Sequence, residues 1–303
     1  MERVENFSIF VEQQLVKVIG LGQSGAQVCE IGGNRIAKLI QRQKLTEEGL
    51  WKKYSHEAEF YRSVQGMELP FVPKMLYADV RESEMLLVME KYNTIDRSEI
   101  SDALLDKVTA VLAGIHTLPV PGFIKQHEQK PLEYVQADCA AYVSGWESVL
   151  QEHGNAFDRS ALHEMARDMN PINRRFYSKR ACFTHGDFHF ENLLQDGKGN
   201  ILACDWQGCG CGDPSGDLSF LMSRLLSDGY PLDGEKLVRA YCRHANKMGL
   251  DVCPEEVRAQ MALSNLNISF MYWHRYLHGA EKERVGDIYG KMLEDYGTLK
   301  NML

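Results

Sequence analysis

The side chains best suited to chemistry lie in the segment 183–194 and shortly after it. Four residues separate Asp187 from Asn192, and Asp205 follows the next apolar run, 201–204. A carboxylate can receive the proton of an incoming hydroxyl, whereas an amide oxygen and a second carboxylate are ligands that Mg²⁺ accepts. Transfer of a phosphoryl group to a hydroxyl requires such groups. The pattern therefore indicates phosphoryl transfer.

The same spacing occurs in the catalytic loop of protein kinases, which have Arg at the position of Gly186. Here the chain reads His185-Gly186-Asp187-x-His189-x-x-Asn192, followed later by Asp205-Trp206. This combination resembles the aminoglycoside phosphotransferase and choline kinase-like family of small-molecule kinases. The resemblance covers most of the chain, because the amino-terminal part also matches. It implies a two-lobed protein kinase-like fold with the nucleotide between the lobes.

The resemblance also implies roles for the residues of the motif. Asp187 is expected to accept or orient the proton of the acceptor hydroxyl, and Asn192 and Asp205 are expected to hold Mg²⁺. His185 is expected to pack beneath the loop and His189 to organise it. Asp and Asn beside Gly also form ordinary turns, so the interpretation depends on the whole set.

Asp217 lies in a sequence that matches the family's G-D-P-x-x-D-L, where this aspartate caps and orients the catalytic loop. A structural alternative is that Asp217 is the N-cap of a helix over 218–227, and the two roles are compatible. The segment 206–217 contains no A-P-E and no long Ser/Thr/Tyr-rich stretch. A protein kinase needs such an activation segment, so a small acceptor is favoured over a polypeptide.

A glycine-rich motif follows the β-like run 15–19. The residues after it read as strand, turn and strand, which predicts a hairpin rather than the helix of a dinucleotide-binding fold. Glycines in such a hairpin let backbone N–H groups approach phosphates. The residues expected to contact the nucleotide here are Gly20, Gly22, Ser24 and Gly25; a plain hairpin turn is the alternative.

Lys38 alternates with Ile36 and Ile40 on one strand face, so it needs a counter-charge. In kinases the equivalent lysine binds the α- and β-phosphates and pairs with a helix glutamate. The next helix, expected over 47–64, offers Glu57 and Glu59, and the family resemblance selects Glu57. A solvated helix face is the alternative for this glutamate.

The apolar strand 85–92 leads into a linker that corresponds to the kinase hinge. By resemblance, Met89 is expected behind the adenine base, and Glu90 to Tyr92 are expected to supply backbone hydrogen bonds to its edge. A plain core strand is the alternative. ATP is the expected co-substrate, and the side chains do not exclude GTP.

Composition is that of a globular protein, with 44% hydrophobic and 25% charged residues in 303. The net charge of −8 argues against nonspecific nucleic-acid binding and slightly favours a cationic acceptor. The chain has no apolar run of about 18 residues and no signal-peptide core in its first residues, so a cytoplasmic protein without a membrane partner is expected. Eight scattered cysteines predict reduced thiols, and the spacing of Cys204, Cys209 and Cys211 is not typical of zinc.

The predicted fold class is α+β, in which residues 1–91 form a small antiparallel β lobe with one helix and residues 92–303 form a larger, mainly helical lobe. Helices are expected over 100–118, 131–181 in two stretches, 234–249, 254–278 and 280–301. The aromatic-rich segment 270–276 is expected to be core, with a cation–π cage as the alternative.

The predicted function is Mg²⁺-dependent transfer of the ATP γ-phosphate to a hydroxyl of a small molecule. A choline-, ethanolamine- or sugar-type kinase and a catalytically silent nucleotide-binding protein of the same fold are the alternatives. The oligomeric state, monomer or homodimer, stays open.

Overall fold

The structure is a computed structural model that describes residues 4–21, 25–126, 130–178 and 180–303. These residues group into two compact units. The first comprises 1–126, 182–211 and 220–250, and the second comprises 127–181, 212–219 and 251–303. The predicted boundary after residue 91 is a functional division between lobes and stays a prediction.

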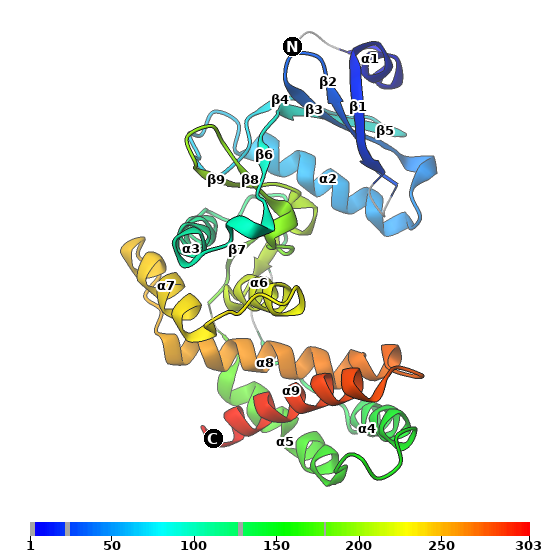
Figure 1. Cartoon of the computed structure of the whole chain (residues 1–303), viewed down its shortest axis with the longest axis vertical. Helices are drawn as coiled ribbons and strands as arrows, with labels where there is room; N and C mark the ends of the chain where they lie inside the picture. Colours follow the sequence, from blue (N-terminus) through cyan, green and yellow to red (C-terminus); the bar gives the residue numbers. More distant parts are fainter. Residues whose placement is uncertain (1–3, 22–24, 127–129, 179) are drawn as a thin grey trace. The chain divides into compact units, whose positions relative to one another are not determined.

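A five-stranded antiparallel sheet dominates the amino-terminal part of the first unit (Figure 1). Its spatial order is β1 (Leu15–Leu21), β2 (Gln27–Ile31), β3 (Arg35–Gln41), β5 (Glu84–Glu90) and β4 (Met75–Val80). Successive residues of β5 point to opposite faces, so Leu86 and Val88 pack beneath α1 (Phe7–Gln14), whereas Met85 and Leu87 pack against α2 (Glu48–Ser63).

Helix α1 is a correction to the sequence analysis, which expected a single helix in the small β lobe. The Asn6 side chain accepts a hydrogen bond from the backbone N–H of Ile9 at 3.0 Å and so caps the helix. Phe7 and Val11, four residues apart, are both buried against the sheet. The N-cap and the single apolar face together stabilise this short helix, although the segment around it is rich in strand-forming residues.

Helix α2 is fixed to the segment that follows β9 (Ile201–Ala203) by stacked aromatic rings. The ring centroids of Phe60 and Trp206 are 3.9 Å apart with an interplanar angle of 19°, and Phe183 stacks on Phe60 at 5.5 Å. All three side chains are fully buried. The stack therefore holds the residue before Trp206, which is Asp205, close to α2.

Short strands and long helices complete the first unit. Its remaining elements are β6 (Asn93–Thr94), β7 (Cys182–Thr184), β8 (Leu193–Gln195), α3 (Asp102–His116) and α7 (Gly234–Lys247). Strands β8 and β9 form a hairpin with β6 at its edge. Helices α3 and α7 pack together, and His116 Nδ1 lies 2.8 Å from the Tyr241 hydroxyl.

The second unit is built mainly from helices, which are α4 (Gln136–Gln151), α5 (Ser160–Phe176), α8 (Pro254–Tyr272) and α9 (Lys282–Lys300). Trp146 and Phe270 are fully buried in its core, as expected for aromatic residues at helical spacing, whereas Tyr276 is 70% exposed. Strand β10 (Gly210–Gly212) and helix α6 (Ser215–Ser227) link the two units in sequence. The fold class predicted from the sequence is confirmed.

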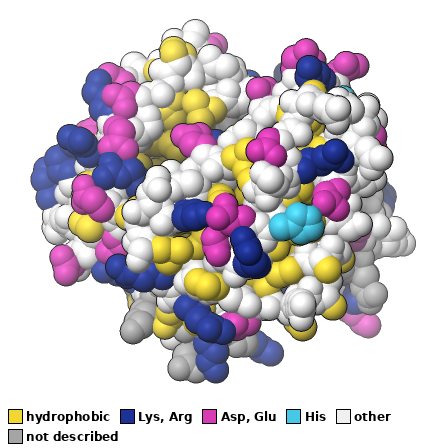
Figure 2. Space-filling view, turned by 90° about the horizontal axis from the view of Figure 1, so that it is seen from below, with side chains coloured by type: hydrophobic (Ala, Val, Ile, Leu, Met, Phe, Trp, Pro, Cys, Tyr) yellow, Lys and Arg dark blue, Asp and Glu magenta, His cyan; other side chains and the backbone are white. Residues whose placement is uncertain are grey.

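The face of the protein shown in Figure 2 is typical of a solvated surface. Basic and acidic side chains are interspersed there, and hydrophobic side chains form small groups between them. Within the described part of the chain, none of the helices combines the length and the apolar character of a membrane span.

The aromatic stack generates a prediction about stability. Phe60→Ala should lower the free energy of unfolding by about 3–5 kcal/mol, because a fully buried ring is lost from a close-packed stack. Urea denaturation of the purified protein measures this change. Leu226→Ala, at a position that is 51% exposed in the same unit, is the control and should cost no more than about 0.5 kcal/mol. Equal losses in the two variants would contradict the importance of the stack.

Candidate active site

Lys38 is the centre of a buried charge cluster formed by three separate elements. Its Nζ atom lies 2.7 Å from Glu57 Oε2 on α2 and 2.7 Å from Asp205 Oδ1 after β9. The Lys38 ammonium also lies over the Tyr54 ring, 4.9 Å from its centroid. The expected pairing of Lys38 with Glu57 is thus present, and Asp205 is a second partner that the sequence analysis did not assign to it.

One cation shared by two carboxylates leaves the cluster with a net negative charge. Burial alone would lower the pKa of Lys38. The carboxylates of Glu57 and Asp205 together raise this pKa by more than burial lowers it, so the lysine stays protonated. Burial raises the pKa of Glu57 to about 7, although Lys38 opposes the shift. Glu57 Oε1 is buried without a hydrogen-bond partner among the described residues, which adds to the cost of its charged form.

The catalytic-loop residues lie around Asp187. Asn192 Nδ2 donates to the Asp187 backbone oxygen at 2.9 Å and to Asp187 Oδ2 at 3.0 Å, and it lies 3.2 Å from His189 Nε2. His189 Nε2 lies 3.6 Å from Asp187 Oδ1. The contact with His189 lowers the pKa of Asp187, more than burial raises it. Asp187 is therefore a carboxylate at neutral pH and can accept a proton.

His185 is fully buried beneath this loop. Its Nδ1 accepts a hydrogen bond from the backbone N–H of Asp187 at 3.3 Å, so Nε2 carries the proton and donates to the Cys204 carbonyl at 3.0 Å. The ring also lies 4.5 Å, between centroids, from Trp206. His185 therefore ties the loop to the segment before Asp205.

Gly186 lies where no other residue fits. Its φ is +78°, and a Cβ atom at this position would lie 2.0 Å from the backbone oxygen of Gly208. The 3₁₀ turn Trp206–Gly208 thus packs directly on the backbone of the loop. This contact is the physical reason for glycine here, where protein kinases have arginine.

The β8–β9 hairpin brings Asn192 and Asp205 to the same end of two paired strands. Asn192 precedes β8, Asp205 follows β9 by two residues, and Cys204 N donates to the Asn192 carbonyl at 2.9 Å. The Asn192 amide oxygen and the Asp205 carboxylate are hard oxygen donors that suit Mg²⁺. Within the described residues there is no cluster of three or more His, Cys, Asp or Glu suited to a metal. The donor set fits an ion that takes its other ligands from phosphates and water.

The expected glycine-rich hairpin is formed by β1 and β2, which pair from Leu21 and Gln27 onward. Gly25 has a φ of +89°, and a Cβ there would lie 2.4 Å from the Lys44 carbonyl oxygen. A Cβ on Gly20 would meet nothing within 4 Å. Gly22 and Ser24 lie outside the described residues.

The strand expected to form the hinge is β5, where Met89 is buried. The backbone N–H of Glu90 donates to the Lys74 carbonyl at 3.1 Å, and its side chain pairs with the Lys74 ammonium at 2.7 Å. The Tyr92 hydroxyl accepts a hydrogen bond from Lys74 N at 3.2 Å. The N–H groups of Glu90 and Lys91 are thus both paired within the protein, and the expected backbone contacts with adenine stay a prediction.

Asp217 is buried in the second unit and lies inside the first turn of α6. The helix begins three residues earlier than expected because Asp213 Oδ1 accepts a hydrogen bond from Ser215 N at 2.7 Å. The alternative role of Asp217 as the N-cap is therefore wrong. Its role in orienting the catalytic loop stays a prediction.

Glu191, Arg97 and Arg224 lie beside the loop, and the sequence analysis missed them. Arg97 Nη2 lies 3.1 Å from Glu191 Oε1, and Arg224 Nη2 lies 3.3 Å from Glu191 Oε2. The same Oε2 is 3.6 Å from His189 Nδ1. Only the position of Glu191 next to Asn192 could have marked it, because Arg97 and Arg224 are distant in sequence.

Comparisons with known proteins agree with this geometry. The model of the family described as "Phosphotransferase enzyme family" matches residues 17–292. A comparison with curated proteins finds no match.

Solved structures with a similar fold differ widely in sequence. The streptomycin–ATP–APH(2")-IIa ternary complex has 14% identity and a TM-score of 0.55, with 97% of each chain covered. Choline kinase LicA from Streptococcus pneumoniae has 17% identity and a TM-score of 0.52, over 97% of this chain and 98% of that one. Macrolide 2'-phosphotransferase MphH from Brachybacterium faecium has 14% identity and a TM-score of 0.55, over 94% and 96%.

Because the sequence identities are this low, the similarity to these solved structures shows only that the fold is shared. The family model, in contrast, spans most of the chain, including the segments that carry Lys38, Asp187 and Asp205. The chain therefore belongs to the phosphotransferase enzyme family.

Proposed function

We propose that the protein transfers the γ-phosphoryl group of ATP to a hydroxyl group of a small molecule, with Mg²⁺ as cofactor. One observation carries the proposal: Lys38 is bound by both Glu57 and Asp205, and the same unit presents Asp187 and Asn192 in mutual hydrogen bonds. A silent nucleotide-binding protein would not need this complete set.

In the proposed reaction, Asp187 meets the acceptor hydroxyl. The hydroxyl oxygen forms a bond to the γ-phosphorus, the bond from that phosphorus to the β–γ bridging oxygen breaks, and ADP leaves. The hydroxyl proton passes to the Asp187 carboxylate, whose lowered pKa keeps it ionised beforehand. Because phosphoryl transfer states are loose, the position of Asp187 matters more than its basicity.

Lys38 is proposed to neutralise the α- and β-phosphates, while Glu57 fixes the direction of its ammonium group. Asn192 and Asp205 are the residues that would hold Mg²⁺, which when bound would neutralise charge on the phosphates. Asp205 Oδ1 pairs with Lys38 in this structure. With nucleotide and metal bound, Asp205 would contact the metal instead. Lys38 would keep its pair with Glu57 and contact a phosphate. Met89 and the segment from Glu90 to Tyr92 are proposed to border the adenine.

The acceptor is proposed to be a small hydroxylated compound, with a slight preference for a cation because the chain carries a net charge of −8. Similar folds occur in proteins named for aminoglycosides, choline and macrolides, which sets the panel to be tested. ATP is favoured as donor because an ATP complex is among these structures.

Asp187→Ala tests the reaction. With an active acceptor found from a panel of streptomycin, choline, ethanolamine, a macrolide and simple sugars, kcat should fall by about 10²–10⁴-fold, because the proton acceptor is lost. ATP affinity, measured by calorimetry, should change little. Asp187→Asn keeps the size of the side chain and controls for packing. A fully active Asp187→Ala protein would refute the assignment.

Glu57→Gln tests the charge cluster. Because the pKa of Glu57 rises from about 4.5 to about 7 on folding, the glutamate favours folding below pH 4.5 and loses this contribution as pH rises through 7. The free energy of unfolding of the unchanged protein minus that of Glu57→Gln should therefore decrease between pH 5 and pH 8. Urea denaturation across this range measures the difference.

Glu59→Gln removes an exposed carboxylate of the same helix and is the matched control for loss of charge. A difference between the unchanged protein and Glu57→Gln that does not vary with pH would contradict the account.

Glu191→Ala tests the support of the loop. Removing the carboxylate takes this partner from Arg224, leaves Arg97 with Asp228 and loosens His189, which contacts Asn192. The Mg²⁺ concentration needed for half-maximal activity should rise about 10–100-fold, which is the usual cost of losing a residue behind a metal ligand. Glu191→Gln keeps one oxygen for the arginines and should lose less. An unchanged Mg²⁺ requirement in Glu191→Ala would show that the loop does not depend on this carboxylate.

A further inference from the structure

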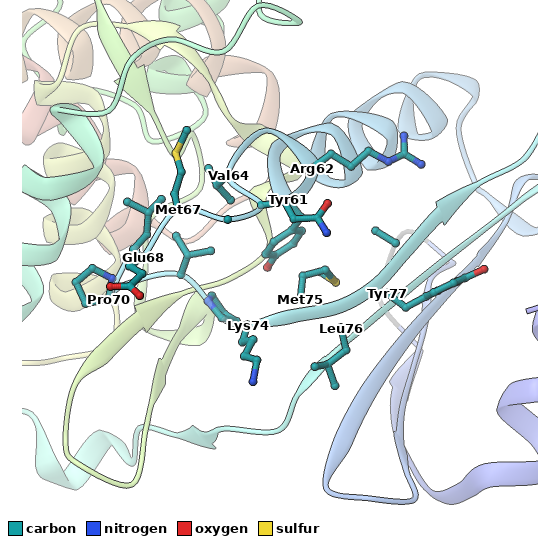
Figure 3. Close-up of a pocket in the computed structure, with 16 residues that line it drawn as sticks. Tyr61, Arg62, Val64, Met67, Glu68, Pro70, Lys74, Met75, Leu76 and Tyr77 are labelled. Atoms are coloured by element: carbon teal, nitrogen blue, oxygen red, sulfur yellow. The ribbon is translucent and has the colours of Figure 1, made fainter. Parts of the chain in front are cut away.

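A large pocket in the first unit lies at the outer edge of the five-stranded sheet, where β4 is the last strand. It has a volume of about 1070 Å³ and is bordered by the last turn of α2, the loop 64–74 and the β4 residues 75–78 (Figure 3). Successive strand residues point to opposite faces, so a wall made of four in a row includes the edge of the strand. Of the described residues, none in β5 lines the pocket, which places it beside the sheet rather than beneath it.

The hydrogen bonds between β4 and β5 show which backbone groups face this edge. The N–H of Arg81 donates to the carbonyl of Glu84 at 2.9 Å, which marks a bonded pair of the antiparallel ladder. Bonded and non-bonded pairs alternate in such a ladder, so Ala78, three positions earlier, belongs to a non-bonded pair. Its N–H and C=O therefore point away from β5. The same holds for Met75, since Lys74 before it is bonded to β5.

The amino-terminal segment approaches β4 without using these outward groups. Val4 N donates to the Tyr77 hydroxyl at 3.2 Å, and the Arg81 guanidinium donates to the carbonyls of Val4 and Glu5. All of these contacts use side chains of β4, and within the described part of the chain the outward backbone groups have no partner. An open edge of this kind is completed by another extended chain, because a backbone offers donors and acceptors at the same repeat.

The side of the pocket next to α2 offers contacts to apolar side chains. Met67 is 52% exposed there, and Val64 and Val72 also line the wall. Figure 3 shows Val64 and Met67 on one side of the pocket and the strand from Lys74 to Tyr77 on the other. A chain paired to β4 would direct every second side chain toward this apolar side and the others away from it. The pocket therefore favours a sequence in which apolar and polar residues alternate.

The charges around the pocket favour a basic partner. The two basic side chains of the wall already have acidic neighbours, since Arg62 lies 3.5 Å from Glu59 and Lys74 lies 2.7 Å from Glu90. Glu68, in contrast, has no ion-pair partner among the described residues and is exposed. The whole chain carries a net charge of −8. Local and overall charge thus agree in attracting a positively charged segment.

We propose that the edge of β4 binds an extended, basic segment of a partner protein, which pairs with β4 as an additional strand and places a lysine or arginine near Glu68. The six residues of β4 span about 20 Å, which sets the length of the paired segment at about six residues. None of the residues expected to bind the nucleotide lines the pocket. The proposal concerns binding alone and stands apart from the phosphotransfer reaction.

A fluorescent hexapeptide of alternating valine and lysine, with blocked ends, is the probe. Fluorescence anisotropy should show saturable binding to the protein without nucleotide, and amide hydrogen exchange of the segment 75–80 should slow. Two forms of the peptide, methylated on the backbone nitrogens of either the valines or the lysines, keep the same charge. Because a strand presents alternate residues to each edge, one form should lose about tenfold or more in affinity and the other should lose little.

Variants of the protein test the same pairing from the other side. Ala78→Pro removes an outward N–H but no bond of the ladder, a change that edge strands tolerate, and it should lower the affinity about tenfold or more. Ala78→Ser keeps the N–H and should bind as the unchanged protein does. Glu68→Gln should lower the affinity about two- to fivefold at low salt.

The methylated peptides keep the test valid even where Ala78→Pro does not fold, because they are measured on the unchanged protein. Absence of saturable binding, equal affinity of the two methylated peptides, an unchanged affinity in folded Ala78→Pro, or an affinity that does not respond to Glu68→Gln would each overturn the proposal.

Discussion

The buried ion pair of Lys38 with two carboxylates is the interaction on which the rest of the site depends. Three elements distant in sequence, β3, α2 and the end of the β8–β9 hairpin, meet at one ammonium group. The lysine is shared between the buried Glu57 and the partly exposed Asp205, and Glu57 Oε1 is left without a partner among the described residues. A cluster with unpaired negative charge gains from a divalent cation that withdraws one of the carboxylates. Burial, and then the neighbouring charge of Asp205, raises the pKa of Glu57, and the same excess of carboxylates fits Mg²⁺.

Close packing keeps these charges in place. Trp206 stacks on Phe60 and fixes the position of Asp205, and the turn after it rests on the backbone of Gly186. His185 then joins the two segments through one hydrogen bond in each direction. The parts of the site that are proposed to hold the metal and to accept the proton are thus built on one another. A change of residue 186 to any side chain would separate them, because no rotamer removes a Cβ.

The sequence predicted the parts of the site that depend on local pattern. The H-G-D motif, the strand lysine and the helix glutamate have fixed spacing, and apolar periodicity placed the long helices within a few residues. Helix α1 was missed because its N-cap and two apolar positions give a weak signal beside a strand-rich segment. The start of α6 was misplaced because Asp213, not Asp217, provides the cap. Arg97 could not be found, since its contact with Glu191 joins residues that only the fold brings together.

Helix α2 relates the charge cluster around Lys38 to the aromatic stack. Glu57, Phe60 and Tyr61 follow the i, i+3, i+4 spacing and therefore share one face of the helix. The first pairs with Lys38, the second stacks on Trp206, and the third is buried beside them. A helix moves as a rigid element, so a displacement at Tyr61 would also act on the ion pair and on the aromatic stack. The ion pair and the aromatic stack are therefore coupled through this helix, and neither can shift alone.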